Sequence, residues 1–333
     1  MMITIKEYAT VAEIPDEWDS VIGDNLYLSK EFLAFMERVD QCGQKYYMLY
    51  ADGILDSVFM TYVRKKYNLA MFTRWNLFTK MTLVYVPLSV TRPGVAYHRH
   101  LTEVMDFVKT IKGPKIFLNL GDEDAHDFAK GLTCPKCIWM NRYDSFSQYL
   151  NSLRSSYRYR YTKCLKKSGP LTIEYLTDNA QFTDEMYDCY LQVYNKSRIR
   201  VEKLPIAFFR GKFFKIFVLK NQDKVVGFGQ MLENGTELIF EFVGVDYRYN
   251  NIYDTYHRIL LEIVRYGIEK GFKTIDFGQT ADESKLKLGA EYTMLYAYLH
   301  HSCKLVNAAN KKLAKHIQYK PISTDYRVFK EDI

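Results

Sequence analysis

The chain has 333 residues, of which 48% are hydrophobic and 26% charged, and these proportions exclude a disordered protein. No run approaches 18 uncharged apolar residues, and the N-terminus lacks a basic start followed by an apolar stretch, so we expect neither a membrane span nor a signal peptide. The net charge of +7 is local, because residues 152–167 hold six Lys or Arg and no acid, whereas residues 1–150 hold 17 Lys and Arg against 18 Asp and Glu. Such a charge distribution excludes a protein that coats nucleic acid with its whole surface.

The first half of the chain predicts a mixed α/β unit. Residues 45–63 read as two strands joined by a tight turn at Asp52–Gly53, and a long amphipathic helix is expected near 95–112. Residues 113–140 then read as a strand, a short helix with acidic residues after Gly121, and a final strand after Gly131.

The basic segment at the start of the second half predicts an amphipathic helix over 150–167. Its apolar residues fall within about 120° of a helical wheel, and Gly169–Pro170 ends it: Leu150, Leu153, Tyr157, Tyr161, Cys164 and Leu165. The other faces carry cations without a balancing Glu, which favours an anion as partner; a solvated helix face is the alternative.

The rest of the second half repeats the order of the first. Three strands with tight turns are expected over 213–245, a helix over 250–270, and a strand, helix and strand over 271–296, with Gly278 and Gly289 matching Gly121 and Gly131. The sequence therefore predicts an α/β fold of α+β type with mixed sheets, built as two tandem units over residues 1–148 and 149–333.

Four segments in this order resemble the GNAT acyltransferase superfamily in its tandem form, which includes the Fem-type peptidoglycan aminoacyltransferases. They are LRSSYRYRYTKCLKK, VYNKSRIRVEKLPIAFF (193–209), VVGFGQML (225–232) and FGQTADESKLKLGAE (277–291). The resemblance covers about residues 150–320; over 1–145 it depends on the internal repeat, and the N-terminal unit is a degenerate copy. It implies an N-acyltransferase that moves an acyl group from acyl-CoA, such as acetyl-CoA, to a small-molecule or peptide-like amine held in the cleft between the units.

By the same resemblance, the donor's pyrophosphate lies near residues 248–253. The family's signature is Arg/Gln-x-x-Gly-x-Gly/Ala at a helix N-terminus, where backbone N–H groups face phosphate. Arg248 fits this pattern, Asn251 tolerates a left-handed backbone, and Tyr253 departs from it. Arg248, Asn250, Asn251, Tyr253 and Lys285 are the expected donor-binding residues, and Lys285 could also reach the acyl carbonyl.

Acyl transfer to an amine needs a base and an acid. Glu241 is the one acid inside the apolar strand ELIFEFVGV, where burial would raise its pKa as a base requires; the alternative is the wet face of an edge strand. Asp276 ends a strand and is a second candidate base or a helix cap. Tyr292 or Tyr296 could protonate the leaving thiolate, and we take Tyr292.

Four cations are candidates for binding the acceptor or other anions: Arg158, Lys163, Arg198 and Arg200. Two alternatives stay open. A Fem-type enzyme would take its acyl group from aminoacyl-tRNA and modify a cell-wall precursor, with the basic helix on tRNA phosphates; a protein that has lost its donor site would be a binding module.

The six cysteines are scattered through a large chain, which favours reduced thiols in a cytoplasmic protein. Cys134 and Cys137 have the spacing of half a zinc site, but no second pair lies at usable spacing, so no metal is expected. The oligomeric state is not predicted.

Overall fold

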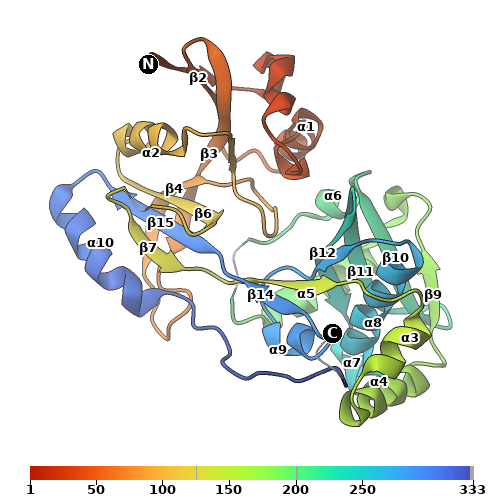
Figure 1. Cartoon of the computed structure of the whole chain (residues 1–333). Coiled ribbons are helices and arrows are strands. Elements are labelled where there is room, and N and C mark those ends of the chain that lie inside the picture. The colour runs from red at the N-terminus through yellow and green to blue at the C-terminus, as the bar shows by residue number, and fades with distance from the viewer. Residues whose placement is uncertain (125, 200–201, 331–333) are drawn as a thin grey trace. The chain divides into compact units, whose positions relative to one another are not determined.

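A computed structural model describes residues 1–124, 126–199 and 202–330 (Figure 1). The chain divides into two compact units: unit 1 comprises Met1–Pro135 and Met294–Pro321, and unit 2 comprises Lys136–Thr293 and Ile322–Ile333. The chain therefore passes from one unit to the other three times. This division differs from the single boundary at 148/149 that the internal repeat suggested.

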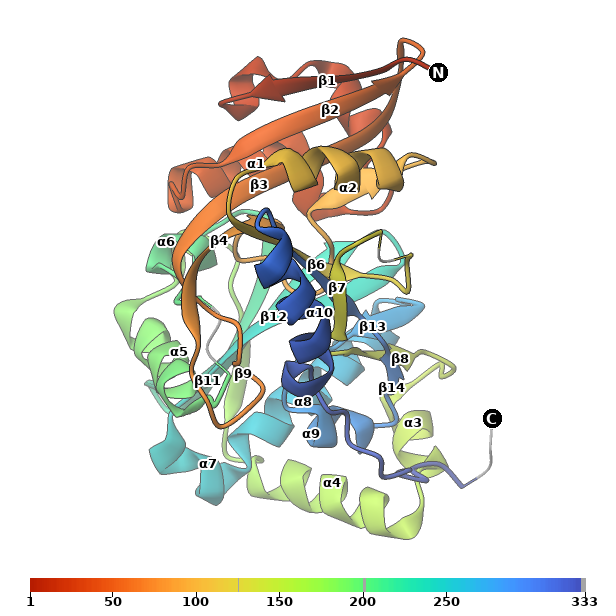
Figure 2. The same ribbon diagram turned by 90° about the vertical axis from the view of Figure 1, so that its left-hand side faces the viewer.

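Unit 1 contains a mixed sheet in the order β1-β2-β3-β4-β6-β15-β7, with β5 paired to β3 (Figure 2). All its pairings are antiparallel except β4 with β6. Its described strands are β1 (Ile3–Tyr8), β2 (Lys45–Ala51), β3 (Ile54–Asn68), β4 (Phe78–Val84), β5 (Val95–Tyr97), β6 (Pro114–Leu120), β7 (Ala129–Leu132) and β15 (Tyr296–His301). Its helices are α1 (Lys30–Val39), α2 (Leu101–Thr110) and α10 (Lys304–Ile317).

Strand alternation explains why both faces of β2 are covered. Tyr46 meets the buried Trp18 edge-on at 6.2 Å, whereas its neighbour Tyr47 stacks on Phe59 at 4.7 Å and contacts Phe107 of α2, since successive strand residues point to opposite faces. The turn expected at Asp52–Gly53 is confirmed: both residues have positive φ, as a tight hairpin turn requires.

Two expectations for residues 113–140 were wrong. The short helix after Gly121 is absent from the described residues there, and the segment turns directly into β7. The last strand, β8 (Lys136–Met140), does not return to the sheet of unit 1 but lies between β13 and β14 of unit 2. In unit 1, β15 from near the C-terminus pairs with both β6 and β7.

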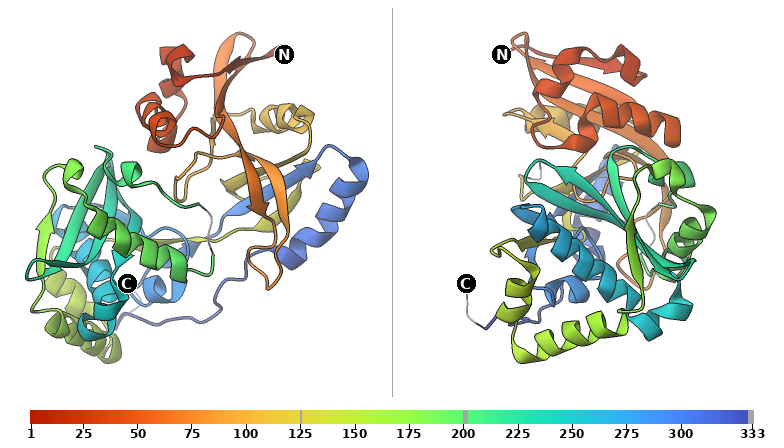
Figure 3. Two further views of the ribbon diagram at one scale, coloured as in Figure 1. Left: turned by 180° about the vertical axis from the view of Figure 1, so that it is seen from behind. Right: turned by 90° about the vertical axis from the view of Figure 1, so that its right-hand side faces the viewer.

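Unit 2 contains a mixed sheet in the order β14-β8-β13-β12-β11-β10-β9 (Figure 3). Its other described strands are β9 (Thr172–Tyr175), β10 (Phe214–Asn221), β11 (Lys224–Asn234), β12 (Glu237–Val245), β13 (Thr274–Asp276) and β14 (Glu291–Thr293). Its helices are α3 (Phe146–Ser152), α4 (Ser155–Lys167), α5 (Asp184–Lys196), α6 (Ile206–Phe209), α7 (Tyr247–Tyr253), α8 (Thr255–Glu269) and α9 (Asp282–Leu286).

Helices cover both faces of this sheet, and glycines in the strands allow the helices to pack close to the backbone. A Cβ on Gly229 of β11 would meet Ile259 of α8 at 3.1 Å, and a Cβ on Gly244 of β12 would meet Cys189 of α5 at 2.9 Å. The apolar face of α8 is buried as its periodicity predicts. The core of unit 2 therefore lies between α8 and the sheet, with α3 and α4 outside α8.

Neither predicted long helix of unit 2 is continuous. The basic helix is interrupted at Leu153, which forms a β-bridge with Phe329, while the N–H of Arg154 donates to the Val328 carbonyl (2.9 Å). Its inward face is nevertheless as expected, since Leu153, Tyr161 and Cys164 are buried. The helix expected over 250–270 is divided into α7 and α8 by Asp254, which has a left-handed backbone (φ 50°).

Candidate active site

Strands β12 and β13 form a fork in the middle of the unit 2 sheet. They run parallel and pair only from Glu237 with Thr274 to Ile239 with Asp276, whereas β12 continues to Val245 and pairs with β11 along its whole length. Among the described residues, the stretch 240–245 thus has no strand partner on the β13 side. An added strand or an extended ligand can pair with the exposed side of a strand in such an arrangement.

A β-bulge places Glu241 at the opening of the fork. The partner of β11 shifts from Phe242 at Gln230 to Phe240 at Met231, so Glu241 is the extra residue; bulges of this kind redirect a side chain. Glu241 is 6% exposed, so the carboxylate predicted from the strand sequence is indeed buried and not on a wet edge.

Gln230, which the sequence reasoning missed, faces the bulge. It is fully buried, and neither its amide nitrogen nor its amide oxygen has a hydrogen-bond partner among the described residues. Buried polar groups are nearly always paired, so this amide marks a place where a ligand is expected. The available signal was a single amide within the apolar run VVGFGQML.

Buried charges gather at the carboxyl end of β13, beside the fork. Asp276 is fully buried; its Oδ1 accepts from the N–H of Gly278 (2.8 Å), and its Oδ2 lies 3.9 Å from Nζ of Lys136. Lys285 is 3% exposed and donates to the Gln279 carbonyl (2.8 Å). Asp276 and Lys285, two of the predicted residues, therefore lie in one buried polar region.

Asp282 joins this region to Tyr292. The Tyr292 hydroxyl donates to Oδ2 of Asp282 (2.8 Å), and burial together with this carboxylate raises the pKa of the phenol. Burial also raises the pKa of the Cys137 thiol to about 12, with Lys285 opposing the shift and both Asp282 and Asp276 adding to it. Lys285, Asp282 and Asp276 thus lie within electrostatic reach of the Cys137 thiol, and so does Tyr292. We call Asp276, Asp282, Lys285 and Tyr292 the acid–lysine cluster.

The turn that carries the cluster is strained. Thr280 and Ala281, immediately before α9, both have left-handed backbones (φ 63° and 51°), which is a rare conformation for any residue and especially for β-branched threonine. Strain of this kind is retained where the surroundings enforce it, often at functional sites.

Arg248, the predicted pyrophosphate ligand, is engaged by its own helix cap. Its guanidinium donates through Nε and Nη2 to the carboxylate of Asp246 (2.6–3.2 Å), although the Arg248 side chain is 71% exposed. Asp246 also accepts from the Arg248 N–H as the N-cap of α7. The guanidinium holds the pKa of the Asp246 carboxyl below its ordinary value, so a negative charge stands where the phosphate was expected.

The neighbouring predicted residues build the joint between α7 and α8. Asn250 accepts from the N–H of Tyr256 (3.1 Å), and the Asn251 carbonyl accepts from Lys167 of α4 (3.3 Å). Tyr253 stacks on Tyr249. Each residue therefore has a structural contact in this joint.

The predicted acceptor-binding cations do not form one cluster with these residues. Arg158 and Lys163 lie on α4, where Lys163 is exposed and sits over the Tyr159 ring (5.9 Å). Arg198 is exposed after α5, and Arg200 lies outside the described residues.

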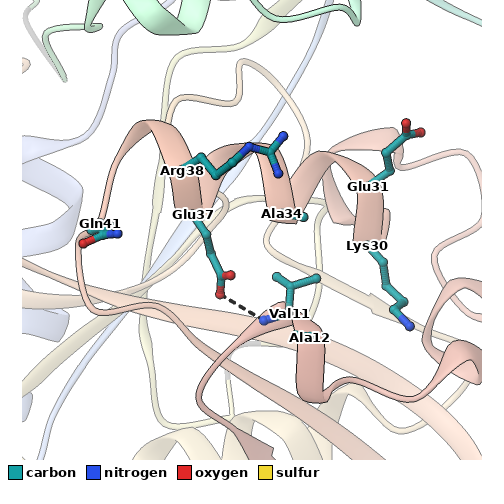
Figure 4. Close-up of a pocket in the computed structure, with 8 residues that line it drawn as sticks. All are labelled: Val11, Ala12, Lys30, Glu31, Ala34, Glu37, Arg38 and Gln41. Atoms are coloured by element: carbon teal, nitrogen blue, oxygen red, sulfur yellow. Dashed lines mark hydrogen bonds between the residues drawn. The ribbon is translucent and has the colours of Figure 1, made fainter.

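Surface cavities also occur outside the fork. One, of about 610 Å³, lies in unit 2 between Tyr292, the β8 edge and the C-terminal segment around Ile322–Phe329. Another, of about 570 Å³, is a groove along α1 in unit 1, where Glu37 accepts from the Val11 N–H (3.0 Å) (Figure 4). The second groove lies in the other unit from the acid–lysine cluster.

Within the described residues, no three His, Cys, Asp or Glu side chains converge as a metal site would require. The described helices also include none with the length and apolarity needed to cross a bilayer.

Comparison with known proteins finds a family model that matches part of the chain. Residues 151–286 match the model of the acetyltransferase (GNAT) domain, and that range contains the fork and most of the acid–lysine cluster. No curated protein matches the sequence.

Two solved structures have a similar fold. A conserved protein of unknown function from Bacteroides thetaiotaomicron is 12% identical with a TM-score of 0.53, over 90% of this chain and 99% of that one. L-PGS from Bacillus licheniformis is 12% identical with a TM-score of 0.50, over 85% of this chain and 94% of that one. The chain thus resembles the GNAT acyltransferase superfamily, and the part that matches the model of the acetyltransferase (GNAT) domain is residues 151–286.

Proposed function

We propose that this protein is an N-acyltransferase that uses an acyl-CoA thioester as donor and an amine as acceptor. The observation that carries the proposal is the fork, where β12 and β13 stop pairing just before the buried carboxylate Glu241. The amides of a pantetheine chain can pair with residues 240–245 as an added strand would, which aligns the thioester with the fork.

Glu241 is the base in this proposal. The acceptor amine loses a proton to the carboxylate as its nitrogen attacks the thioester carbonyl, forming a C–N bond and a tetrahedral oxyanion. Burial of Glu241 suits the task, since desolvation favours the protonated carboxyl that the step produces. Lys285, a buried cation at the same end of the sheet, supplies positive charge for the oxyanion.

Collapse of the intermediate breaks the C–S bond, and the leaving thiolate takes a proton from Tyr292. The raised pKa of this phenol keeps it protonated before the reaction, and Asp282 holds the hydroxyl in place. Asp276 orients the turn through its bond to the Gly278 N–H.

Hydrogen exchange tests the donor site directly. Acetyl-CoA should protect backbone N–H groups of 240–245, whereas the sheet-edge strand β9 should exchange unchanged. At about a hundred times its dissociation constant, the donor should also stabilise the fold by roughly 2.7 kcal/mol. If CoA, acetyl-CoA and longer acyl-CoAs cause neither protection nor stabilisation, the donor assignment is wrong.

One observation favours a second candidate, an aminoacyl-tRNA donor. The Asp246 carboxylate occupies the N-terminus of α7, where the CoA pyrophosphate would otherwise bind, while α4 presents cations without acidic residues of its own. Binding of charged tRNA should then fall steeply with salt, because each neutralised phosphate releases counterions. Binding that does not change with salt would exclude this candidate.

A further inference from the structure

Exposed apolar side chains gather at the loop between β3 and β4 in unit 1 (orange in Figure 2). Trp75 is 80% exposed and Leu77 and Phe78 are about half exposed, whereas the other two tryptophans, Trp18 and Trp139, are fully buried. Three large apolar residues within four positions form a patch of the kind that marks an interaction surface.

The loop is held in a defined conformation by its own polar groups. Asn68 Oδ1 accepts from the N–H groups of Ala70 and Leu77 (3.1 and 3.0 Å), and its Nδ2 donates to Asn76 (2.9 Å). Thr73 Oγ1 accepts from the Trp75 N–H (3.0 Å). Because backbone groups are satisfied internally, the loop presents apolar and cationic side chains outward.

The charges around the loop have one sign. Residues 65–80 contain four Lys and Arg and no acid, whereas residues 1–56 of the same unit contain four against eleven acids. Lys65, Lys66, Arg74 and Lys80 are exposed near the apolar side chains, and Lys66 lies 5.2 Å from the Phe78 ring centre. The loop therefore carries a strong local positive charge within a unit whose N-terminal part is acidic.

The C-terminal end of helix α10 lies next to this loop. Phe72 of the loop meets Tyr319, just beyond α10, edge-on at 5.3 Å. Leu305 is 83% exposed on the helix, and Val306 and Leu313 are also exposed. Residues 292–324 contain five lysines and no acid. We define the hairpin face as the exposed side of α10 together with seven residues of the loop and of the strand ends beside it: Lys65, Lys66, Arg74, Trp75, Leu77, Phe78 and Lys80.

We propose that the hairpin face docks on the surface of an anionic lipid bilayer. Its cations complement lipid phosphates, and clusters of Lys and Arg bind such surfaces through additive electrostatic attraction. Trp75 suits the headgroup region, where tryptophan is enriched, while Leu77 and Phe78 enter the acyl boundary. A single-stranded nucleic acid would instead favour several stacking rings in a groove, and exposed leucines contribute nothing to phosphate binding.

Trp75 provides the test, because it is the exposed tryptophan of the three. The full-length protein is titrated with vesicles of phosphatidylcholine alone and of phosphatidylcholine with about one third phosphatidylglycerol. We expect a blue shift of tryptophan emission and quenching by brominated acyl chains with the anionic vesicles, and little change with the neutral ones. Absence of binding to the anionic vesicles would overturn the proposal.

Variants assign the binding to this face. Lys65, Lys66 and Lys80 all replaced by Glu should weaken vesicle affinity by on the order of a hundredfold or more, given the effect of each cation. The matched control changes the exposed Lys112, Lys270 and Lys273 to Glu and should bind within a few-fold of the original protein.

A second pair of variants tests the apolar contribution by co-sedimentation. Leu77→Ala should reduce binding, whereas Ile54→Ala, at the exposed turn at the other end of β3, should not. If the substitutions in the hairpin face leave vesicle affinity unchanged, the lipid assignment is wrong. It is also wrong if the protein binds RNA but no vesicle and the same substitutions abolish RNA binding. Unchanged thermal unfolding of each variant shows that it is folded.

Discussion

The hydroxyl of Tyr292 donates a 2.8 Å hydrogen bond to Oδ2 of the buried Asp282. The same hydroxyl lies 3.4 Å from the Ile322 N–H, which donates to it. Tyr292 therefore connects the C-terminal segment of unit 2 with the acid–lysine cluster.

Tyr292→Phe should lower both stability and acyl-transfer rate. Loss of the donor to a buried carboxylate should cost about 1–3 kcal/mol of unfolding free energy, and loss of the proton donor should lower kcat at least about tenfold. Chemical denaturation and a thiol-release assay measure the two effects. Tyr149→Phe is the control, since it removes a buried hydrogen bond to the Leu288 carbonyl (3.0 Å) and should affect stability alone. Equal rate losses in both variants would contradict a specific role for Tyr292.

Glu241→Gln should remove the base and keep the fold. We expect kcat to fall about 10²- to 10⁴-fold with donor affinity nearly unchanged, since glutamine has the same shape. Glu237→Gln, at the start of the same strand and at the other end of the β12–β13 pairing from the opening of the fork, should retain activity. A small, pH-independent loss in the Glu241 variant would show that another group takes the proton.

The sequence was sufficient to predict candidate catalytic residues on β12 and at the end of β13. Glu241 stood out as an acid in the interior of an apolar strand, and Asp276 as an acid at a strand end. Their spatial relation depended on the parallel register and on the bulge, which no local pattern encodes. Asp282 was missed because an acid at the start of a helix is ordinarily a solvated cap, whereas here it is 3% exposed.

Long-range pairing also explains the errors in the fold. An apolar strand pattern identifies a strand but not its sheet, so the placement of β8 and β15 could not be predicted. The break before α4 depends on Phe329, which is more than 170 residues away in sequence. The left-handed backbone between α7 and α8 falls on Asp254, and no glycine in the sequence indicated it.

Asp246→Asn should tighten acyl-CoA binding if the donor phosphates lie at α7. Asparagine caps a helix as well as aspartate does, so the change removes negative charge and frees Arg248 while α7 keeps its N-cap. Thermal shift with CoA should therefore increase, and Arg248→Ala should decrease it. If Asp246→Asn leaves CoA binding unchanged or weaker, the phosphates bind elsewhere.

His300 should make the protein less stable in acid. Burial, with the nearby Lys115 and Lys109, lowers its pKa to about 4 in the folded protein, below the ordinary value of about 6.5. The unfolded chain then binds more protons between pH 6.5 and 4, so this residue's contribution to stability is present above pH 6.5 and is lost as the pH falls toward 4. We expect the unfolding free energy, measured with urea, to change less between pH 7 and pH 5 in His300→Gln than in the exposed His98→Gln. Equal differences would contradict the assignment.

A fragment containing unit 2 should fold only if it includes strand β8. A fragment of residues 136–333 keeps β8 between β13 and β14, together with the fully buried Cys137 and Trp139. A fragment of residues 149–333 lacks these side chains, and loss of one buried large aromatic alone costs about 3–5 kcal/mol, a large share of a domain's stability. We therefore expect cooperative thermal unfolding, followed by circular dichroism, for the first fragment and not for the second. In full-length protein, Trp139→Ala should destabilise by a similar amount, which tests the packing without truncation. Cooperative unfolding of the shorter fragment at the same temperature would show that β8 is dispensable to the sheet of unit 2.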